Sequence, residues 1–206
     1  MKTHWIEELY QITEKDPYSQ YGEGKYLEHI FKNLPSGSEA FIDIGAGDGV
    51  HLSNTRYLKD SGWWGVLLDK VNGQFITAEN ILDHALPAHP DLVSIDIDGN
   101  DYWVLKSLLS SIKPKVIIAE FNAAFTDDRV MPYDPEHVWA GDNYYGFSFL
   151  AGQRLGKEFG YEVIFQNDNV NMYFVQERLI NVPIPPVTFQ KINFFTPSDK
   201  WNTHPS

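Results

Sequence analysis

One stretch of the sequence decides the fold, Phe41-Ile42-Asp43-Ile44-Gly45-Ala46-Gly47-Asp48-Gly49. A short apolar run leads into a turn rich in glycine, and a helix-like stretch follows it. Glycine lets the backbone turn sharply and approach a ligand closely, and the amino terminus of a helix adds free N–H groups. The pattern predicts a buried strand, a ligand-binding loop and a helix, in that order.

Two classes of ligand use a loop of this kind. Dinucleotides are bound by G-x-G-x-x-G, whose third glycine would fall where this chain has Val50. Asp43 precedes the first glycine by two residues, which suits a cationic amino acid end better than a pyrophosphate. Asp69 follows the next apolar run and can accept hydrogen bonds from ribose hydroxyls. The loop therefore favours a ligand that combines a ribose with a cationic end.

The chain continues as an alternation of apolar runs and helix-like stretches. The further runs are short and bounded by Gly, Asp or Asn, at Gly65–Leu68, Leu92–Ile97 and Val116–Phe121. Such runs are typical of strands that are buried on both faces of a parallel sheet. The stretches between them read as helices over about 50–60, 77–86 and 101–112. This alternation predicts a doubly wound α/β fold with a mostly parallel sheet.

The end of the sheet has a different pattern. Residues 122–145 are rich in Asp, Asn, Pro and Tyr and are expected to form a loop-like insertion, followed by a helix over about 146–159. Two strand-like segments, Tyr161–Gln166 and Val170–Glu177, then flank a turn-forming triplet. They must pair antiparallel, because a parallel pair needs a crossover of about a dozen residues. We expect the sheet to end in an antiparallel hairpin.

The chain therefore divides into three parts. Residues 1–39 carry two amphipathic N-terminal helices, residues 40–181 form the α/β domain with its insertion, and residues 182–206 form an extended tail. The tail contains four aromatic side chains, Phe189, Phe194, Phe195 and Trp201. Leaving them exposed would be costly, so we expect the tail to pack on this chain or to form a homo-oligomer contact.

Composition excludes several functions. The chain has no cysteine, which excludes disulfides, zinc–thiolate sites and thiolate nucleophiles. Its formal net charge of −12 repels phosphate backbones, so we expect no nucleic-acid partner. No segment resembles a signal peptide or approaches the apolar length of a membrane span. We therefore expect a cytoplasmic protein without a membrane partner.

The glycine loop with the strand-end acid resembles motif I of the class I S-adenosylmethionine-dependent methyltransferases, a Rossmann-like family whose sheet also ends in an antiparallel hairpin. More narrowly, the chain resembles the FkbM-like branch over most of residues 18–177. The segments that carry this resemblance are Gln20–Glu23, Gly47–Thr55, Gly62–Leu67, Ser94–Trp103, Glu120–Asn122 and Pro132–Pro135.

The resemblance implies S-adenosylmethionine as the cofactor. The implied binding residues are Tyr21, Gly22, Asp43, Gly45, Ala46, Gly47, Asp48, Asn54, Asp69, Asp96 and Ile97. One departure concerns the region between Asp69 and Leu92, where the chain is about one helix shorter than the family. That region normally builds one wall of the adenine pocket. We expect a sheet shortened after its second strand, with a weaker adenine site or with another segment as the wall.

An acidic motif follows the next strand. Asp96 and Asp98 are two residues apart and point the same way if the backbone is extended. They could contact the methionyl end of the cofactor, act as a general base on a substrate hydroxyl, or bind Mg²⁺. In the alternative interpretation, Asp98-Gly99-Asn100-Asp101 is only a turn and a helix cap.

Three further residues complete the catalytic candidates. Glu120 and Asn122 end the following strand, and His137 lies in the insertion that could cover a substrate. With Asp96 and Asp98 they predict an O-methyltransferase for a small hydroxylated, sugar-like molecule, a substrate class that rests on the resemblance. Two alternatives remain open: a methyltransferase-fold protein that binds without catalysis, and a metal-dependent glycosyltransferase that uses Asp96-Ile97-Asp98.

Overall fold

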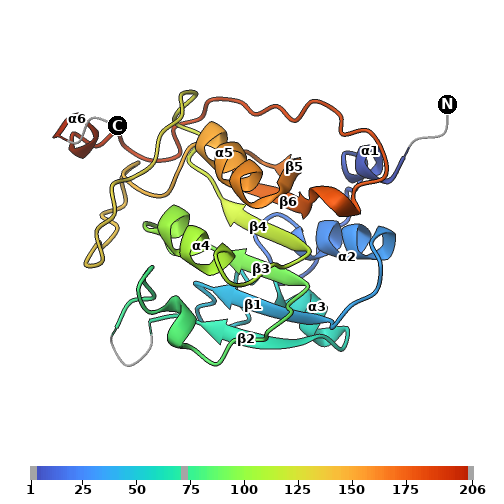
Figure 1. Cartoon of the computed structure of the whole chain (residues 1–206). Coiled ribbons are helices and arrows are strands. Elements are labelled where there is room, and N and C mark those ends of the chain that lie inside the picture. The colour runs from blue at the N-terminus through green and yellow to red at the C-terminus, as the bar shows by residue number, and fades with distance from the viewer. Residues whose placement is uncertain (1–3, 71–73, 204–206) are drawn as a thin grey trace.

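The computed structural model describes residues 4–70 and 74–203. Its centre is a six-stranded sheet with the order β2-β1-β3-β4-β6-β5 (Figure 1). The strands are β1 (Ala40–Ile44), β2 (Trp64–Leu68), β3 (Leu92–Ile95), β4 (Val116–Glu120), β5 (Tyr161–Asn167) and β6 (Asn171–Gln176). The first four strands run parallel, and β6 lies antiparallel between β4 and β5. The predicted fold class is confirmed.

The hairpin between β5 and β6 forms as its sequence requires. Asp168 and Asn169 have φ angles of 52° and 59°, in the left-handed region that tight hairpin turns use. Asn and Asp are among the few side chains that tolerate this conformation. The turn therefore fixes the antiparallel register of β5 and β6, in which Asn167 lies opposite Asn171.

Helices cover both faces of the sheet. Figure 1 shows α4 (Asp101–Leu109) and α5 (Phe149–Phe159) in front of it, where their apolar residues share one core with Ile42 and Ile44 of β1. The opposite face carries α1 (Trp5–Leu9), α2 (Glu23–Asn33) and α3 (Arg56–Asp60), whose apolar residues share a second core with Phe41. Alternate strand residues thus enter two separate cores, as expected for strands buried on both faces.

The region between β2 and β3 is short, as predicted, but the helix expected over 77–86 is wrong. Only a single 3₁₀ turn, η1 (Ile81–Asp83), forms there. Thr77 and Asn80 exchange side-chain-to-backbone hydrogen bonds of 2.8 and 3.3 Å, which offer the backbone an alternative to a helix. The helix expected over 50–60 is also shorter, because Leu52 has a φ of 56° and α3 begins only at Arg56.

The insertion and the tail lie against each other. A short 3₁₀ turn, η2 (Glu177–Leu179), precedes the tail, which ends in α6 (Lys200–Thr203). Phe189 packs on Phe121 and Phe149, and the amide of Ile192 donates to the carbonyl of Ala123 at 3.0 Å. The tail therefore packs on its own chain. None of the described helices has the length and apolar character needed to cross a membrane.

Candidate active site

A row of polar side chains crosses the sheet at the carboxyl ends of its strands. Asp43 of β1 pairs with Ser94 of β3, and β3 and β4 are paired so that Asp96 follows beside Glu120. Glu120 in turn pairs with Asn171 of β6. These side chains alternate with the apolar residues that face α4 and α5. They therefore point toward the face that carries α2 and α3.

Two cavities open at this edge of the sheet. The first has a volume of about 320 Å³ and is lined by Gly45, Asp69, Lys70, Phe75, Ile76, Asp96, Ile97, Asp98, Gly99, Asn100 and His137. The second, of about 230 Å³, is lined by Asp43, Gly45, Ala46, Gly47, His51, Leu52, Ser53, Asn54, Ser94, Asp96 and Asp98. Gly45, Asp96 and Asp98 belong to both, so the cavities meet at these residues.

The meeting point requires glycine at position 45. Gly45 has a φ of 88°, and a Cβ atom there would lie 1.6 Å from the carbonyl oxygen of Asp96. Any side chain would therefore push the glycine loop away from the end of β3. This close approach places the loop directly against the acidic motif.

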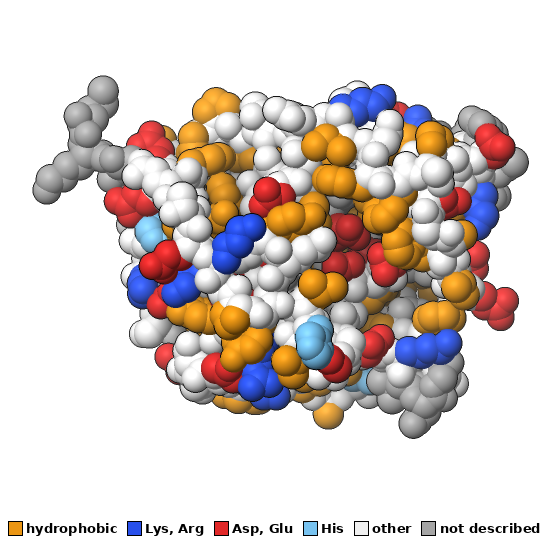
Figure 2. All heavy atoms as spheres, turned by 180° about the vertical axis from the view of Figure 1, so that it is seen from behind, with side chains coloured by type: hydrophobic (Ala, Val, Ile, Leu, Met, Phe, Trp, Pro, Cys, Tyr) orange, Lys and Arg blue, Asp and Glu red, His pale blue; other side chains and the backbone are white. Residues whose placement is uncertain are grey.

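Asp96, Asp98 and Glu120 form a carboxylate cluster. One oxygen of each lies within 4.8 Å of the others, and Oε2 of Glu120 is buried without a hydrogen-bond partner. Seen from behind, the molecule shows acidic side chains gathered around a hollow near the middle of this face (Figure 2). The sequence predicted these three residues as catalytic candidates, and the structure brings them together.

The cluster holds protons tightly. Asp96 is open to solvent through the cavities, but protein surrounds it on most sides, and this burial is the main reason why its pKa rises to about 8. The negative charges of Asp101, Asp98 and Asp43 raise the pKa of Asp96 further. Burial and the charge of Asp96 also raise the pKa of Glu120 well above its ordinary value. Near neutral pH, the pair formed by Asp96 and Glu120 therefore remains largely protonated.

Asp101 has a different role from its acidic neighbours. It is buried, and its two carboxylate oxygens accept from the amides of Ile97 and Gly99 at 2.8 and 2.9 Å. Burial raises the pKa of Asp101, and these hydrogen bonds oppose that rise. Asp101 thus shapes the turn, as the turn-and-cap interpretation expected, and the turn leaves Asp98 facing both cavities.

Asp43 and Asn54 meet on the side of the second cavity. The hydroxyl of Thr55 donates to Asp43 at 2.7 Å, and the amide of Asn54 donates to Ser94 at 3.3 Å. Burial raises the pKa of Asp43 to about 6, while the hydrogen bonds from Thr55 and Ser94 limit the rise. The glycine loop is thereby anchored to the sheet on both sides of the cavity.

Three predicted cofactor residues lie away from the cavity linings. Asp48 is exposed, and its hydrogen bonds to His51 are the main reason why its pKa falls to about 2. Tyr21 and Gly22 lie at the start of α2, where burial, with help from charges that include that of Glu120, raises the pKa of the Tyr21 hydroxyl. Tyr21 therefore stands near the carboxylate cluster without lining either cavity.

The other catalytic candidates differ in their placement. His137 lines the first cavity and packs so closely on Gly99 that a Cβ there would lie 2.6 Å from the imidazole. Burial lowers the pKa of His137, so the ring is neutral near pH 7. Asn122 is buried, and its side-chain amide donates to the carbonyls of Asn143 and Tyr145 at 2.9 and 3.1 Å. Asn122 thus holds the end of the insertion.

Sequence reasoning missed several residues. Phe75 and Ile76 line the first cavity, although their segment carries no motif. Glu23 is completely buried and accepts hydrogen bonds from the amides of Asn167 and Asn171 at 2.9 and 3.0 Å. Glu23 belongs to Gln20–Glu23, a segment that carries the family resemblance, and this could have marked it as a functional candidate. Nothing in the sequence around Phe75 indicates a cavity wall.

No protein-family model matches the chain, and no curated protein matches it. Among solved structures it is similar to an O-methyltransferase family protein from Burkholderia thailandensis, with 12% identity, a TM-score of 0.41, and coverage of 82% of this chain and 66% of that one. TnmH gives 12% identity, a TM-score of 0.39, and coverage of 67% and 50%. The pyocyanin biosynthetic protein PhzM has 12% identity and a TM-score of 0.36, and the match covers 83% of this chain and 53% of PhzM. The chain thus spans about half to two thirds of the length of these proteins.

Proposed function

We propose that the protein is an S-adenosylmethionine-dependent methyltransferase for a small hydroxylated molecule. The observation that carries this proposal is the pair of cavities that meet at Gly45, Asp96 and Asp98. A ligand with a nucleoside at one end and an amino acid at the other would occupy both cavities. Its reacting sulfur would then lie at their meeting point, beside the carboxylate cluster.

The first cavity suits the adenosine part. Asp69 is positioned to accept hydrogen bonds from ribose hydroxyls, and Phe75 and Ile76 supply an apolar wall. The segment that carries this wall is fixed at two points: Ser107 donates to the carbonyl of Ala78 at 2.6 Å, and Tyr133 donates to Glu79. The chain thus supplies an adenine wall from the short connection that replaces the longer one of the family.

The second cavity suits the methionyl part. Asp43 and Asp96 line it, and Asp43, whose pKa of about 6 leaves it mainly ionised at pH 7, supplies negative charge for an ammonium group. Asn54 adds a polar group at the same wall. The cofactor also carries a positive sulfonium, so the acidic surroundings favour it over its neutral thioether product. This difference in charge would help the product to leave.

The carboxylate cluster supplies the acid–base chemistry. When bound, the sulfonium would supply an activated methyl group for in-line transfer to the substrate oxygen, with the C–S electron pair returning to sulfur. The ionised form of Asp96, which becomes the main form only above its pKa of about 8, accepts the proton that the hydroxyl loses. Alignment of the two reactants by the cavity walls can supply about 7–11 kcal/mol of the rate enhancement in favourable cases.

The same three carboxylates also fit Mg²⁺. Asp96, Asp98 and Glu120 each offer one oxygen within a radius that a single ion can span, and hard oxygen ligands are those that Mg²⁺ prefers. Bound there, Mg²⁺ would lower the pKa of a substrate hydroxyl. We include the ion as an optional cofactor, because the buried Oε2 atom of half-buried Glu120 has no hydrogen-bond partner.

Calorimetric titration with S-adenosylmethionine and S-adenosylhomocysteine, with and without Mg²⁺, tests the proposal. We expect micromolar binding that weakens at least about tenfold in Asp69→Ala, since a hydrogen bond to a charged acceptor contributes roughly 1.5–3 kcal/mol. Asp83→Ala, an exposed acid of η1 outside both cavities, is the matched control and should bind normally. If neither ligand binds the wild-type protein, the proposed function is wrong.

A screen of hydroxylated small molecules with a methyl-labelled cofactor then tests the reaction itself. Transfer of label to an oxygen atom, at a rate that depends on Asp96, would support O-methylation. Binding without any transfer would favour the alternative of a methyltransferase-fold binding protein.

A further inference from the structure

The tail and the insertion are joined through one residue, Asn143. Its amide donates to the carbonyl of Thr196 at 2.9 Å, and its side-chain oxygen accepts from the amide of Ser198 at 2.8 Å. Its carbonyl accepts from the indole of Trp201 at 3.0 Å. Because Asn143 is buried, each of these bonds is costly to leave unmade.

Aromatic contacts reinforce this junction. The ring of Trp201 lies 4.9 Å from that of Tyr144, at an interplanar angle of 62°. The ring of Phe195 lies 4.7 Å from that of Trp139 and 5.8 Å from that of Tyr145. These are edge-to-face geometries, which stabilise aromatic pairs beyond the area that they bury.

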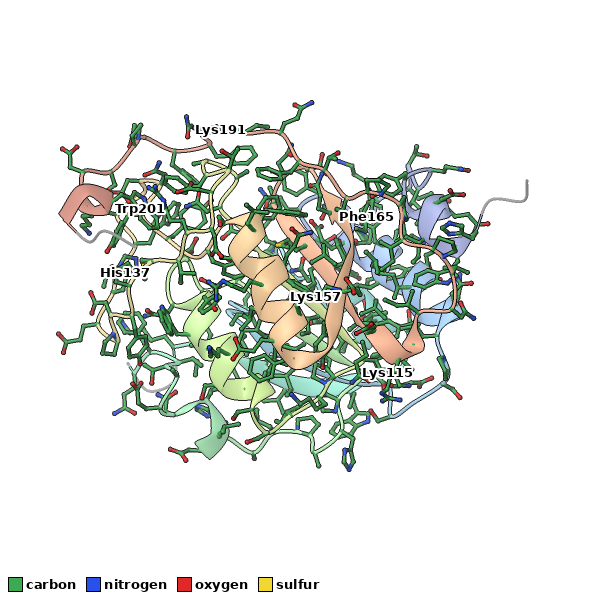
Figure 3. All side chains as sticks on the ribbon, turned by 45° about the horizontal axis from the view of Figure 1, so that its top comes forward. Lys115, His137, Lys157, Phe165, Lys191 and Trp201 are labelled. Atoms are coloured by element: carbon green, nitrogen blue, oxygen red, sulfur yellow. The ribbon has the colours of Figure 1, made fainter. Side chains whose placement is uncertain are left out.

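The residues held in this way reach the candidate active site from two sides. On one side, Tyr144 lies 5.9 Å from His137, which lines the first cavity. On the other side, Tyr145 lies near the carboxylate cluster, since the charges of Glu120 and Asp96 add to burial in raising the pKa of its hydroxyl. Figure 3 shows Trp201 and His137 on the same side of the molecule, where α6 meets the insertion.

We propose that Phe195 and Trp201 are positioning residues for the cofactor site. They form an aromatic clamp that holds Tyr144 and Tyr145, and through Tyr144 also His137, in the arrangement that completes the first cavity. The insertion has little regular structure of its own, so ordering it on ligand binding would cost conformational entropy. The clamp holds the insertion in its ordered conformation before the ligand binds, so this entropy cost is not part of the binding free energy. This inference rests on the proposed function for its ligand.

Two measurements on Trp201→Ala test the clamp. Hydrogen exchange reports on the insertion without any ligand, and we expect the amides of His137 and Asn143 to exchange at least about tenfold faster. Calorimetry with S-adenosylhomocysteine should give about tenfold weaker binding. Both are measured well below the unfolding temperature of the variant. Trp201→Phe keeps a ring but loses the hydrogen bond to Asn143, and should fall between wild type and Trp201→Ala.

Phe194→Ala is the matched control, because Phe194 lies in the same tail but is 45% exposed. It should leave both the exchange rates and the affinity unchanged. Unchanged exchange in Trp201→Ala would overturn the clamp, as would faster exchange with unchanged affinity. Absence of binding by the wild-type protein would instead overturn the proposed function, and the exchange rates would still decide whether the clamp orders the insertion.

Discussion

Two aspartates stand at the two ends of β3, and their surroundings are opposite. Asp91, just before the strand, is 4% exposed, accepts from the amide of Glu39 at 2.8 Å, and lies 3.1 Å from Nζ of Lys115. Asp96, just after the strand, faces the carboxyl groups of Asp98 and Glu120. One acid is paired inside the fold, and the other is left among like charges beside two cavities.

The different surroundings of Asp91 and Asp96 distinguish an acid that stabilises the fold from one that serves a functional site. A buried acid with a cation and a backbone donor supports the folded state, and removing it leaves an uncompensated charge. An acid held among other acids raises the free energy of the folded state, and such groups persist where they serve a ligand or a reaction. We therefore assign the amino-terminal end of β3, with Asp91, to the structural scaffold, and its carboxyl-terminal end, with Asp96, to the candidate site.

The largest expected effect is on catalysis. Asp96→Asn should lower the rate of methyl transfer by about 10²–10⁴, because it removes the proton acceptor of the proposed reaction. Its S-adenosylhomocysteine affinity should change much less, since asparagine keeps the shape of the side chain. A methyl-labelling assay and calorimetry measure the two quantities. Full activity in this variant would remove Asp96 from the mechanism.

The next largest effect is on stability. Asp91→Ala should lower the free energy of unfolding by about 3–5 kcal/mol, because it removes the acceptor of the Glu39 amide and leaves the ammonium of Lys115 with only the carbonyl of Pro35. Urea unfolding measures this change. Where the variant is folded, its affinity for S-adenosylhomocysteine should equal that of wild type. A loss of affinity there would show that the two ends of β3 are not independent.

A smaller effect concerns pH. The pKa of Asp96 is raised from an ordinary value of 3.8 to about 8, so between these values the folded state binds more protons than the unfolded state. The contribution of Asp96 to stability is therefore present at pH 4 and is lost as pH rises toward 8. After discounting for solvent that reaches the group, Asp96→Asn should be more stable than wild type by about 1 kcal/mol at pH 8 and equal at pH 4. Thermal unfolding at both pH values checks the sign.

The smallest effect is expected at Asp48, the exposed partner of His51. Asp48→Asn should leave cofactor affinity unchanged within a factor of about two, since the side chain lines neither cavity. Calorimetry gives the comparison with Asp69→Ala. A loss as large as that of Asp69→Ala would mean that the glycine loop rearranges around its ligand.

Most of the fold could be predicted because its signals are local. Short apolar runs such as Val116–Glu120 are buried on both faces, and the turn at Asp168 and Asn169 uses residues that tolerate a positive φ. The helix predicted over 77–86 does not form, because the spacing of apolar residues does not reveal hydrogen bonds between a side chain and the nearby backbone. Asn80 hydrogen-bonds to the backbone amide of Thr77 and the carbonyl of Phe75, and this local bonding replaces a regular helix.

The site was predictable only in part. Asp96, Asp98 and Glu120 could be placed together because parallel strands end at one edge of the sheet. The contact of Phe75 with the first cavity and the contact of Trp201 with Asn143 could not be predicted. They join irregular segments, where no period or register relates one residue to another, and only the folded chain brings them together.

The junction at Asn143 also has a consequence for the order of folding. Its bond to Trp201 joins residues that are 58 positions apart, and the chain between them contains α5, β5 and β6. Closing so long a loop becomes inexpensive only after those elements have docked and shortened the distance between its ends. We therefore expect the sheet to form before the insertion settles, so that the walls supplied by the insertion take their final shape after the strand ends that carry Asp96 and Glu120.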